Sequence, residues 1–113
     1  MARHLMIVSS EPRDGAEDEF NRFQTDEHVP DVVAAHGFVA AQRFVIAELQ
    51  PEFAKGLPDR RYLTLYEIEG DLAAAIHAVE AGRRSEGRRM SDTMRPDWTC
   101  MMYTAISSRI PRR

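Results

Sequence analysis

Hydrophobic residues recur along this chain with two different periods, and the changes between the periods predict six elements of secondary structure. Four short segments are apolar runs or alternate in polarity, which is typical of strands, and two longer segments repeat every three to four residues, which is typical of helices. In order, the predicted elements are a strand at residues 5–9, a helix at 14–36, strands at 38–49 and 62–69, a helix from 71 to 81 and a strand at 98–107.

Individual residues mark where these elements begin, bend and end. Asp14 with Glu17 three residues later resembles a capping box that starts the first helix, and Asp71 is placed to cap the second. Pro30 lies inside the first helical pattern, where it removes a backbone donor, so it predicts a kink or a new turn. Gly37 fits the left-handed residue that ends a helix.

Two segments between these elements read as irregular. Residues 50–60 hold two prolines and a glycine, which favours a loop that is either an exposed hairpin tip or a functional loop beside a pocket. Residues 82–96 are charged and are predicted to have no regular structure. Along the second helix, one apolar stripe is formed by Leu72, Ala75, Ile76 and Val79.

The order βαββαβ predicts an α+β, ferredoxin-like fold, with two helices on one face of a four-stranded antiparallel sheet. The strands are apolar on both sides. In the strand at 62–69, the side that carries Tyr66 and Ile68 lies opposite the side that carries Leu63 and Leu65, and in the last strand Met101 lies opposite Met102. Two helices can cover one face only, so the other face needs a partner. A second copy of the chain is the simplest partner, and a homodimer is predicted.

Composition sets the class of protein. A length of 113 residues predicts one domain over 1–113, and 43% hydrophobic with 29% charged residues is ordinary for a globular chain. No apolar run approaches the length of a signal peptide core or a membrane helix, so no membrane partner is expected. The single cysteine, Cys100, excludes an internal disulfide and favours a cytoplasmic location, and it reads as a small buried hydrophobe.

Charge is spread unevenly, with a net −8 over residues 1–82 and +5 over residues 83–113. Four arginines, Arg83, Arg84, Arg88 and Arg89, are the basis for considering nucleic-acid binding. A cluster of this size in an acidic protein more often solvates a turn or forms salt bridges, and no nucleic-acid partner is predicted.

The segments DEFNRF, DEHVPDVVAAHGFVAAQRF and RYLTLYEIEG together resemble the dimeric α/β-barrel superfamily, in particular its EthD-like branch and small uncharacterised relatives. In that group an acidic helix with a His-x-Pro sequence leads through Gly-Phe to a strand that bears an arginine. The resemblance covers about residues 4–107. It implies two facing sheets with a cavity, in members that range from isomerases, cyclases and cofactor-free monooxygenases to haem-dependent enzymes, so it implies a cavity and not one reaction.

Two histidines are candidates for proton transfer. His28 matches the position of a functional histidine in methylmuconolactone-isomerase-like members; the alternative is a surface or capping histidine among acidic neighbours. His4 shares a strand face with Met6 and Val8, and Arg3-His4-Leu5 resembles the start of small polyketide cyclases in which a histidine enters the cavity. The alternative for His4 is a strand end in solvent.

Four further residues are candidates for holding a substrate. Arg43 interrupts an apolar strand and needs an anion, which is either a substrate carboxylate or a carboxylate of the protein such as Glu67. Tyr66 and Tyr103 are candidate donors to a developing oxyanion, with core packing as the alternative. Met6 is a candidate for lining an adaptable apolar cavity, with core filling as the alternative.

The sequence offers no spacing for a metal site, no cysteine cluster and no phosphate-binding loop, so no metal and no cofactor are predicted. The leading hypothesis is a cofactor-independent isomerase, cyclase or monooxygenase acting on a small carbonyl-bearing or aromatic molecule, an anionic one included. The alternative is a non-catalytic dimer that binds a small ligand or serves as an accessory protein. In the first case, Arg43, Tyr66 and His28 are predicted to border one cavity on the sheet face turned away from the helices.

Overall fold

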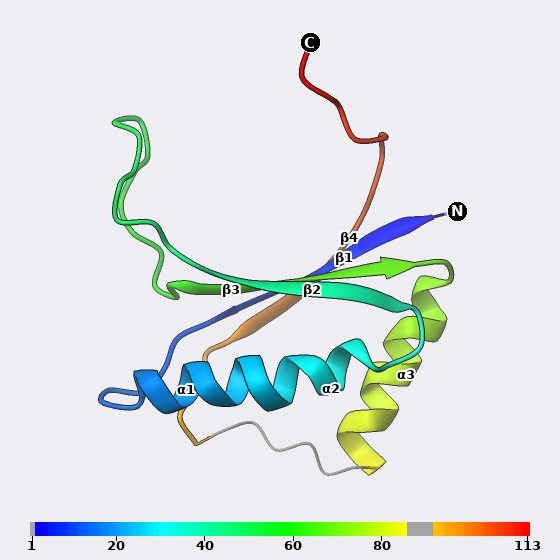
Figure 1. Cartoon of the computed structure of the whole chain (residues 1–113), viewed down its shortest axis with the longest axis horizontal. Helices are drawn as coiled ribbons and strands as arrows, with labels where there is room; N and C mark the ends of the chain where they lie inside the picture. The colour runs from blue at the N-terminus through cyan, green and yellow to red at the C-terminus, as the bar shows by residue number, and fades with distance from the viewer. Residues whose placement is uncertain (1, 86–91) are drawn as a thin grey trace.

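The structure is a computed structural model that describes residues 2–85 and 92–113. Four strands and a set of helical segments follow one another in the predicted βαββαβ order (Figure 1). The elements are β1 (Arg3–Ser10), α1 (Glu17–Phe23), the π-helical turn η1 (Gln24–His28), α2 (Val29–Val33), β2 (Phe38–Val45), β3 (Tyr62–Glu69), α3 (Leu72–Ser85) and β4 (Thr99–Thr104).

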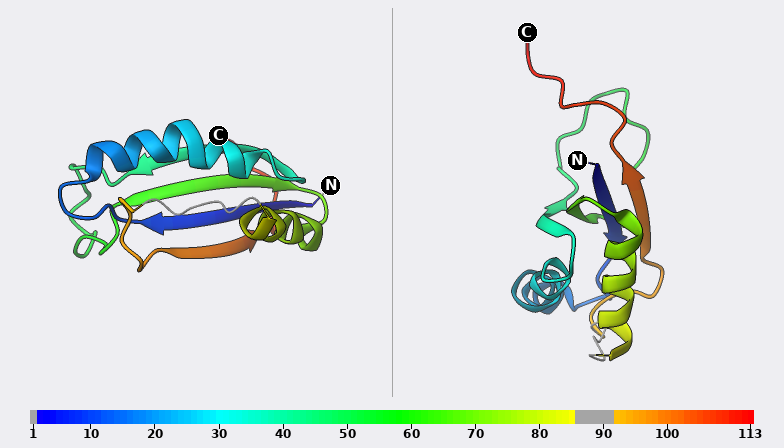
Figure 2. Two further views of the ribbon diagram at one scale, coloured as in Figure 1. Left: turned by 90° about the horizontal axis from the view of Figure 1, so that it is seen from below. Right: turned by 90° about the vertical axis from the view of Figure 1, so that its right-hand side faces the viewer.

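The four strands form one antiparallel sheet in the order β2-β3-β1-β4, which is the ferredoxin-like arrangement. The helical stretch from α1 to α2 runs along the sheet on the β2 side, and α3 lies on the β1–β4 side (Figure 2). All of the helices therefore lie on one face, and the predicted fold class is confirmed.

Side-chain alternation divides the sheet into two faces. The covered face lies under the helices and carries Tyr62, Thr64, Tyr66 and Ile68 of β3, all of them buried. The open face carries the alternate positions, among them Leu63 and Leu65 of β3, Leu5 and Ile7 of β1, Phe44 of β2, and Met101 and Tyr103 of β4.

Packing on the covered face forms the core. One cluster joins both helical layers to the centre of the sheet, and a smaller one holds the start of α1 against β3. The buried members are Met6, Val29, Val32, Tyr66, Ile68 and Ala75 in the first cluster and Phe20, Tyr62 and Met94 in the second.

The first helix adapts to Pro30 through a π-helical turn. Pro30 lacks an N–H, and the backbone ahead of it widens so that the N–H of Val29 donates to the carbonyl of Gln24. The predicted kink or new turn at Pro30 is thus a change of helical winding. The predicted capping box is wrong, because α1 begins at Glu17 behind Ala16 and has no side-chain cap, while Asp14 lies in the preceding turn.

Of two other end signals, the Asp71 cap is confirmed, whereas Gly37 is left-handed as predicted but lies in the turn after α2, which ends at Val33 and not at residue 36. Gly37 has a φ of +88°, and a β-carbon there would lie 3.1 Å from the β-carbon of Ala75, so both the backbone and the space favour glycine. Asp71 Oδ1 accepts hydrogen bonds from the backbone N–H groups of Ala73 and Ala74.

Several predicted bounds need correction. The β2 strand ends at Val45 and not at residue 49, and β4 spans Thr99–Thr104 and not 98–107. The second helix continues to Ser85, so the first part of the segment predicted to be irregular is helical; its apolar stripe simply ends before its last turn. Arg88 and Arg89 lie outside the described residues.

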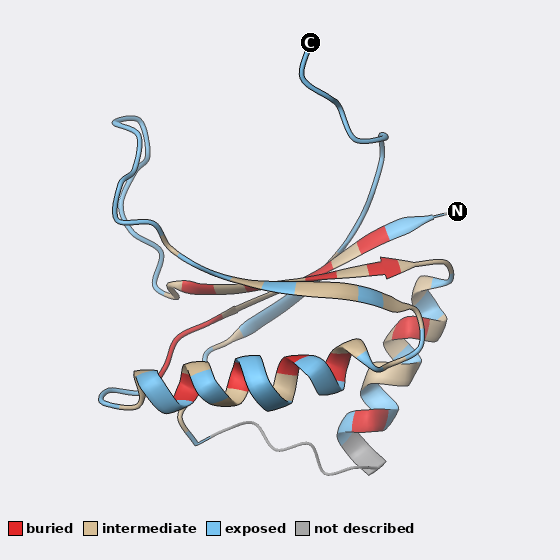
Figure 3. Cartoon of the chain, in the orientation of Figure 1, coloured by how far each residue is buried: buried red, intermediate tan, exposed pale blue. Residues whose placement is uncertain are grey.

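Two segments leave the compact body on the side opposite the helices (Figure 1). One is the β2–β3 connection, residues 46–61, called the arm below. The other is the C-terminal tail, residues 105–113. Both are almost entirely exposed (Figure 3). Among the described residues, no helix is long and apolar enough to cross a membrane.

Candidate functional site

A cavity of about 210 Å³ lies on the covered face, between the sheet and the helices. Strands β1, β3 and β4 form its floor, and η1, α2, α3 and the segment before β4 close its sides. Its lining residues are Met6, Val8, Ser10, Gln24, His28, Val32, Thr64, Tyr66, Ile76, Val79, Glu80, Arg83, Met94, Trp98, Cys100 and Met102.

The π-helical turn supplies two polar side chains to this cavity, Gln24 and His28, at its first and last positions. Gln24 is buried, and its Nε2 lies 3.9 Å from the sulfur of Met94. The His28 ring stacks on Phe23 with ring centroids 5.9 Å apart and planes 18° apart. Because the extra residue of a π turn changes which side chains face the sheet, the local winding at Pro30 decides how this pair is presented.

Strand β3 supplies the polar groups of the floor. Thr64 and Tyr66 are two residues apart and therefore share the covered face, with exposed fractions of 4% and 2%. The ring of Phe38 meets Tyr66 edge-on, with centroids 5.8 Å apart and planes at 84°. Packing of this kind fixes the phenol ring at the cavity wall.

The α3 side of the cavity is its charged side. Glu80 and Arg83 line it one helical turn apart, and the Arg83 guanidinium lies 5.3 Å from the ring centroid of Trp98. Desolvation raises the pKa of the Cys100 thiol, and the charge of Arg83 offsets part of that rise. Cys100 as a residue is exposed, so its sequence-based reading as a buried hydrophobe is wrong.

Three of the predicted site residues come together at this cavity. His28, Tyr66 and Met6 all line it, from η1, β3 and β1 respectively. The face is the opposite of the predicted one, because Tyr66 lies under the helices and not on the open face. Both faces of β3 are apolar, so the alternation separated them correctly without indicating which one the helices cover.

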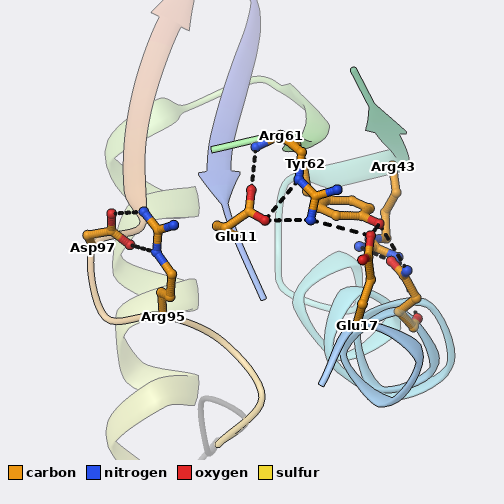
Figure 4. A network of polar contacts seen from close by, with 8 residues as sticks. Glu11, Glu17, Arg43, Arg61, Tyr62, Arg95 and Asp97 are labelled. Carbon is orange, nitrogen blue, oxygen red and sulfur yellow. Dashed lines mark hydrogen bonds and ion pairs between the residues drawn. The ribbon is translucent and has the colours of Figure 1, made fainter. Parts of the chain in front are cut away.

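Arg43 does not line this cavity, although it also lies on the covered face. Its two terminal nitrogens each donate at 3.0 Å, one to Thr25 Oγ1 and the other to Asn21 Oδ1, so the guanidinium turns toward the helix (Figure 4). It also lies 5.3 Å from the ring centroid of Phe20 and 5.5 Å from that of Tyr62. Burial lowers the pKa of Arg43 from its ordinary value.

This geometry overturns the two proposals made for Arg43. The side chain does not border a pocket with His28 and Tyr66, and it does not pair with Glu67, which lies 3.8 Å from Arg3 instead. Neutral oxygens and aromatic faces hold the cation in place, which is a structural arrangement at the junction of α1 and β2.

The polar cluster around Arg43 extends along the end of the sheet (Figure 4). Asn21 Nδ2 donates to the Tyr62 hydroxyl at 3.2 Å, and that hydroxyl donates to Glu17. Arg61 bridges onward, with its NH2 group 3.5 Å from Glu17 and 2.6 Å from Glu11. The links join Tyr62 of β3 and the preceding Arg61 to α1 and to Glu11 just after β1, so the cluster fastens the helix to the sheet beyond the cavity.

His4 and Tyr103 also lie outside the cavity. His4 shares the covered face with Met6, as the alternation predicted, but it lies at the sheet end, where Nδ1 is 3.0 Å from Thr104 Oγ1 and Nε2 donates to the Gly70 carbonyl at 3.1 Å. It is 8% exposed, so it is neither in the cavity nor in solvent. Tyr103 lies on the open face and is 54% exposed, while His36 is exposed in the turn after α2 and His77 is exposed on α3.

Sequence reasoning missed several polar members of the lining, chiefly Gln24, Thr64 and Glu80 with Arg83. Gln24 stands four residues before His28, and Thr64 two residues before Tyr66, so helix and strand periodicity would have placed each beside a residue already chosen. No local signal marks Glu80 and Arg83, because the strand they face is distant in sequence. Residues 2–85 and 92–113 contain no group of three or more His, Cys, Asp or Glu side chains arranged to hold a metal ion.

Comparison with known proteins finds relatives by structure and not by sequence. No family model and no curated protein matches the chain. A provisionally assigned monooxygenase from Shewanella loihica PV-4 superimposes with a TM-score of 0.58 at 15% identity, over 100% of this chain and 99% of that one. An ethyl tert-butyl ether (EthD) family protein from Bacillus halodurans C-125 superimposes with a TM-score of 0.56 at 14% identity, over 90% and 96%. At these identities the likeness establishes a shared fold, the one that the resemblance implied.

Proposed function

We propose that this protein is a cofactor-independent enzyme that acts by proton transfer on a small carbonyl-bearing or aromatic molecule in the cavity under its helices. The observation that carries the proposal is the meeting of His28 and Tyr66 at one small, mainly apolar cavity. One supplies an imidazole for taking and returning a proton, and the other supplies a phenol that can donate a hydrogen bond.

The proposed chemistry begins with His28 as the base. It removes a proton from a carbon next to a carbonyl, or from a phenol, and the negative charge develops on the substrate oxygen. Tyr66 donates a hydrogen bond to that oxygen, with Thr64 and Gln24 as further polar groups at the wall. Reprotonation at another carbon gives an isomer, attack on a second carbonyl gives a ring, and reaction with O₂ gives an oxygenated product.

The size and charge of the cavity narrow the substrate. An engineered apolar cavity of about 150 Å³ binds benzene, so this cavity of about 210 Å³ fits one substituted ring or a compact bicyclic molecule. Arg43 faces elsewhere, and the Arg83 guanidinium at the α3 side is the cationic group of the described lining. An uncharged substrate, or one whose anion reaches the α3 side, is favoured over one with a buried carboxylate.

The neighbours by structure support the enzyme class and, among the three reactions, the oxygenation. The provisional monooxygenase from Shewanella loihica shares the fold over its whole length. A homodimer joined through the open faces completes the proposal, because Leu5, Ile7, Leu63 and Leu65 on that face have no helix above them in one copy.

The test uses the single tryptophan of the chain. Trp98 lines the cavity, so its fluorescence reports occupancy directly. We expect small phenols, quinols and cyclic ketones to change the Trp98 emission saturably, and the turned-over compounds to be found by product mass and O₂ uptake.

Variants separate catalysis from binding. His28→Ala is expected to lower turnover by about 10²–10⁴-fold, the usual contribution of a general base, while Tyr66→Phe keeps the packing and lowers turnover by a smaller factor. His77→Ala, an exposed histidine on α3, is the matched control and is expected to have no effect. Saturable binding without turnover of any compound would favour the alternative, a ligand-binding or accessory dimer. Binding that survives filling of the cavity by Val8→Phe would reject this cavity as the site.

A further inference from the structure

The arm, residues 46–61, carries large apolar side chains that nothing in the same copy covers. Leu49, Phe53 and Leu57 are 90%, 83% and 73% exposed. Within the arm, the Ala54 N–H donates to the Pro51 carbonyl at 3.0 Å and the Ile46 N–H to the Arg61 carbonyl at 2.9 Å, and at its end the Arg61 N–H donates to Glu11 at 2.8 Å. Exposed leucine and phenylalanine side chains on a projecting segment are typical of a surface that meets a partner.

The direction of the arm indicates where that partner lies. The arm leaves the sheet on the side of the open face, away from the helices, and so does the C-terminal tail (Figure 1). The open face itself exposes Phe44, Met101 and Tyr103 at 43%, 62% and 54%. Apolar sheet and apolar arm thus face the same side, which is continuous with the homodimer interface of the proposed function.

A groove lies at the opposite end of the sheet from the arm. It lies between the open face and the tail and has a volume of about 1130 Å³. Leu5, Tyr103 and Ile106 give it apolar walls, Glu67 and Glu69 give it acidic groups, and Arg3 and Arg109 also line it. Glu67 lies 3.8 Å from Arg3, and the backbone N–H of Glu69 donates to the carbonyl of Gly37.

The two features stand at opposite ends of the strands. The arm begins where Val45 pairs with Tyr62, and the groove lies where Arg3 pairs with Glu69. A two-fold axis between two facing sheets and perpendicular to the strands exchanges these ends. Each arm is then brought over the groove of the other copy, whereas an axis along the strands would bring arm onto arm.

We infer that the arm of one copy seats in the groove of a second copy, so that the homodimer is held by two reciprocal clasps as well as by its sheet faces. Phe53 and Leu57 pack against Tyr103 and Ile106, and Lys55 between them meets the acidic side of the groove. An isologous arrangement satisfies both arms and both grooves at once. The inference rests on the homodimer of the proposed function and adds the segment that joins the copies.

The first experiment measures the dimer dissociation constant by sedimentation velocity over a dilution series. The double variant Phe53→Ser, Leu57→Ser is expected to raise it at least tenfold, and His77→Ser, on an exposed site of α3, is the matched control. Because the changed residues are exposed, circular dichroism is expected to be unchanged. A dissociation constant equal to that of the wild type would overturn the clasp while leaving the homodimer standing, and a monomeric wild type would overturn both.

The second experiment locates the arm without relying on affinity. A photoreactive phenylalanine analogue at position 53, in a mixture of isotopically light and heavy chains, is expected to form light–heavy cross-links to residues 103–110 or 67–69. Cross-links to the partner's arm, or within the same chain, would overturn the clasp.

Discussion

The two faces of the sheet each depart from the usual rule of burial in a different way. The covered face, which is buried, holds His4, Thr64 and the cavity with its polar groups, whereas the centre of the open face is lined by Leu63 and Leu65. A buried polar group and an exposed apolar patch are the two informative departures from ordinary burial. Together they are the basis for the proposals that the covered face serves binding and chemistry and that the open face serves assembly.

The sharpest test of this contrast compares two aliphatic residues of the same strand. Ile68, 1% exposed on the covered face, is expected to cost about 2–5 kcal/mol of unfolding free energy when changed to alanine. Leu65→Ala on the open face should cost less than about 1 kcal/mol at concentrations where the protein is monomeric. Urea denaturation of both variants measures the difference, and equal losses in the monomer would erase the distinction between the faces.

A charge on the open face should affect assembly more than folding. We expect Leu65→Glu to raise the dimer dissociation constant about a hundredfold, which corresponds to about 2.7 kcal/mol, because two copies of an unpaired carboxylate would be buried at the interface. Light scattering against concentration measures this, with His77→Glu on the exposed side of α3 as the control. An unchanged dissociation constant would place the interface elsewhere.

Arg43 tests whether the end of the covered face is structural. Arg43→Ala removes the hydrogen bonds to Asn21 and Thr25 and the contacts with two aromatic rings, so it should lower stability by about 1–2 kcal/mol. Ligand affinity measured through Trp98 is expected to stay within about twofold of the wild type, which is smaller than a single neutral hydrogen bond is worth. Loss of affinity for an anionic ligand without loss of stability would restore Arg43 to the binding site.

The smallest expected effect is on the stability of the fold at acidic pH. Burial by itself raises the pKa of Glu11, but the side-chain and backbone hydrogen bonds from Arg61 and the charges of Arg61 and Arg95 outweigh it and hold the pKa below its ordinary value of 4.5. A depressed pKa stabilises the fold at pH values above 4.5, and this stabilisation is lost as the pH falls through the lowered value. Glu11→Gln should therefore flatten the dependence of melting temperature on pH below 4.5, and identical profiles would contradict the assignment.

Much of the fold is written in local sequence. The βαββαβ order, the bounds of β3, the left-handed Gly37 and the Asp71 cap were all predicted, because each depends on periodicity or on the conformational preference of one residue. The predicted cap at Asp14 was wrong, because a capping pattern indicates only where a helix can begin. The helix α1 begins three residues later, at Glu17.

The candidate site was predicted in part. His28, Tyr66 and Met6 were each chosen as candidates for a cavity, and all three line the cavity under the helices, on the face opposite to the predicted one. Arg43 was assigned to the same pocket because it shares a face with Tyr66, but a long side chain can turn toward either neighbour on that face. The Arg43 guanidinium donates to Asn21 and Thr25 on the helical stretch, and the periodicity of the sequence does not indicate these partners.

By itself, then, the sequence determined the elements, their order and the division of each strand into two faces, because these follow from interactions between residues close along the chain. Tertiary structure alone decided which face lies under the helices. Both faces of β3 are apolar, and the alternation separates the two faces without indicating which one is covered. That choice depends on contacts between residues far apart in the sequence. The helices supply these contacts by packing on Tyr66 and Ile68, and that choice places the cavity on one side of the sheet and the arm on the other.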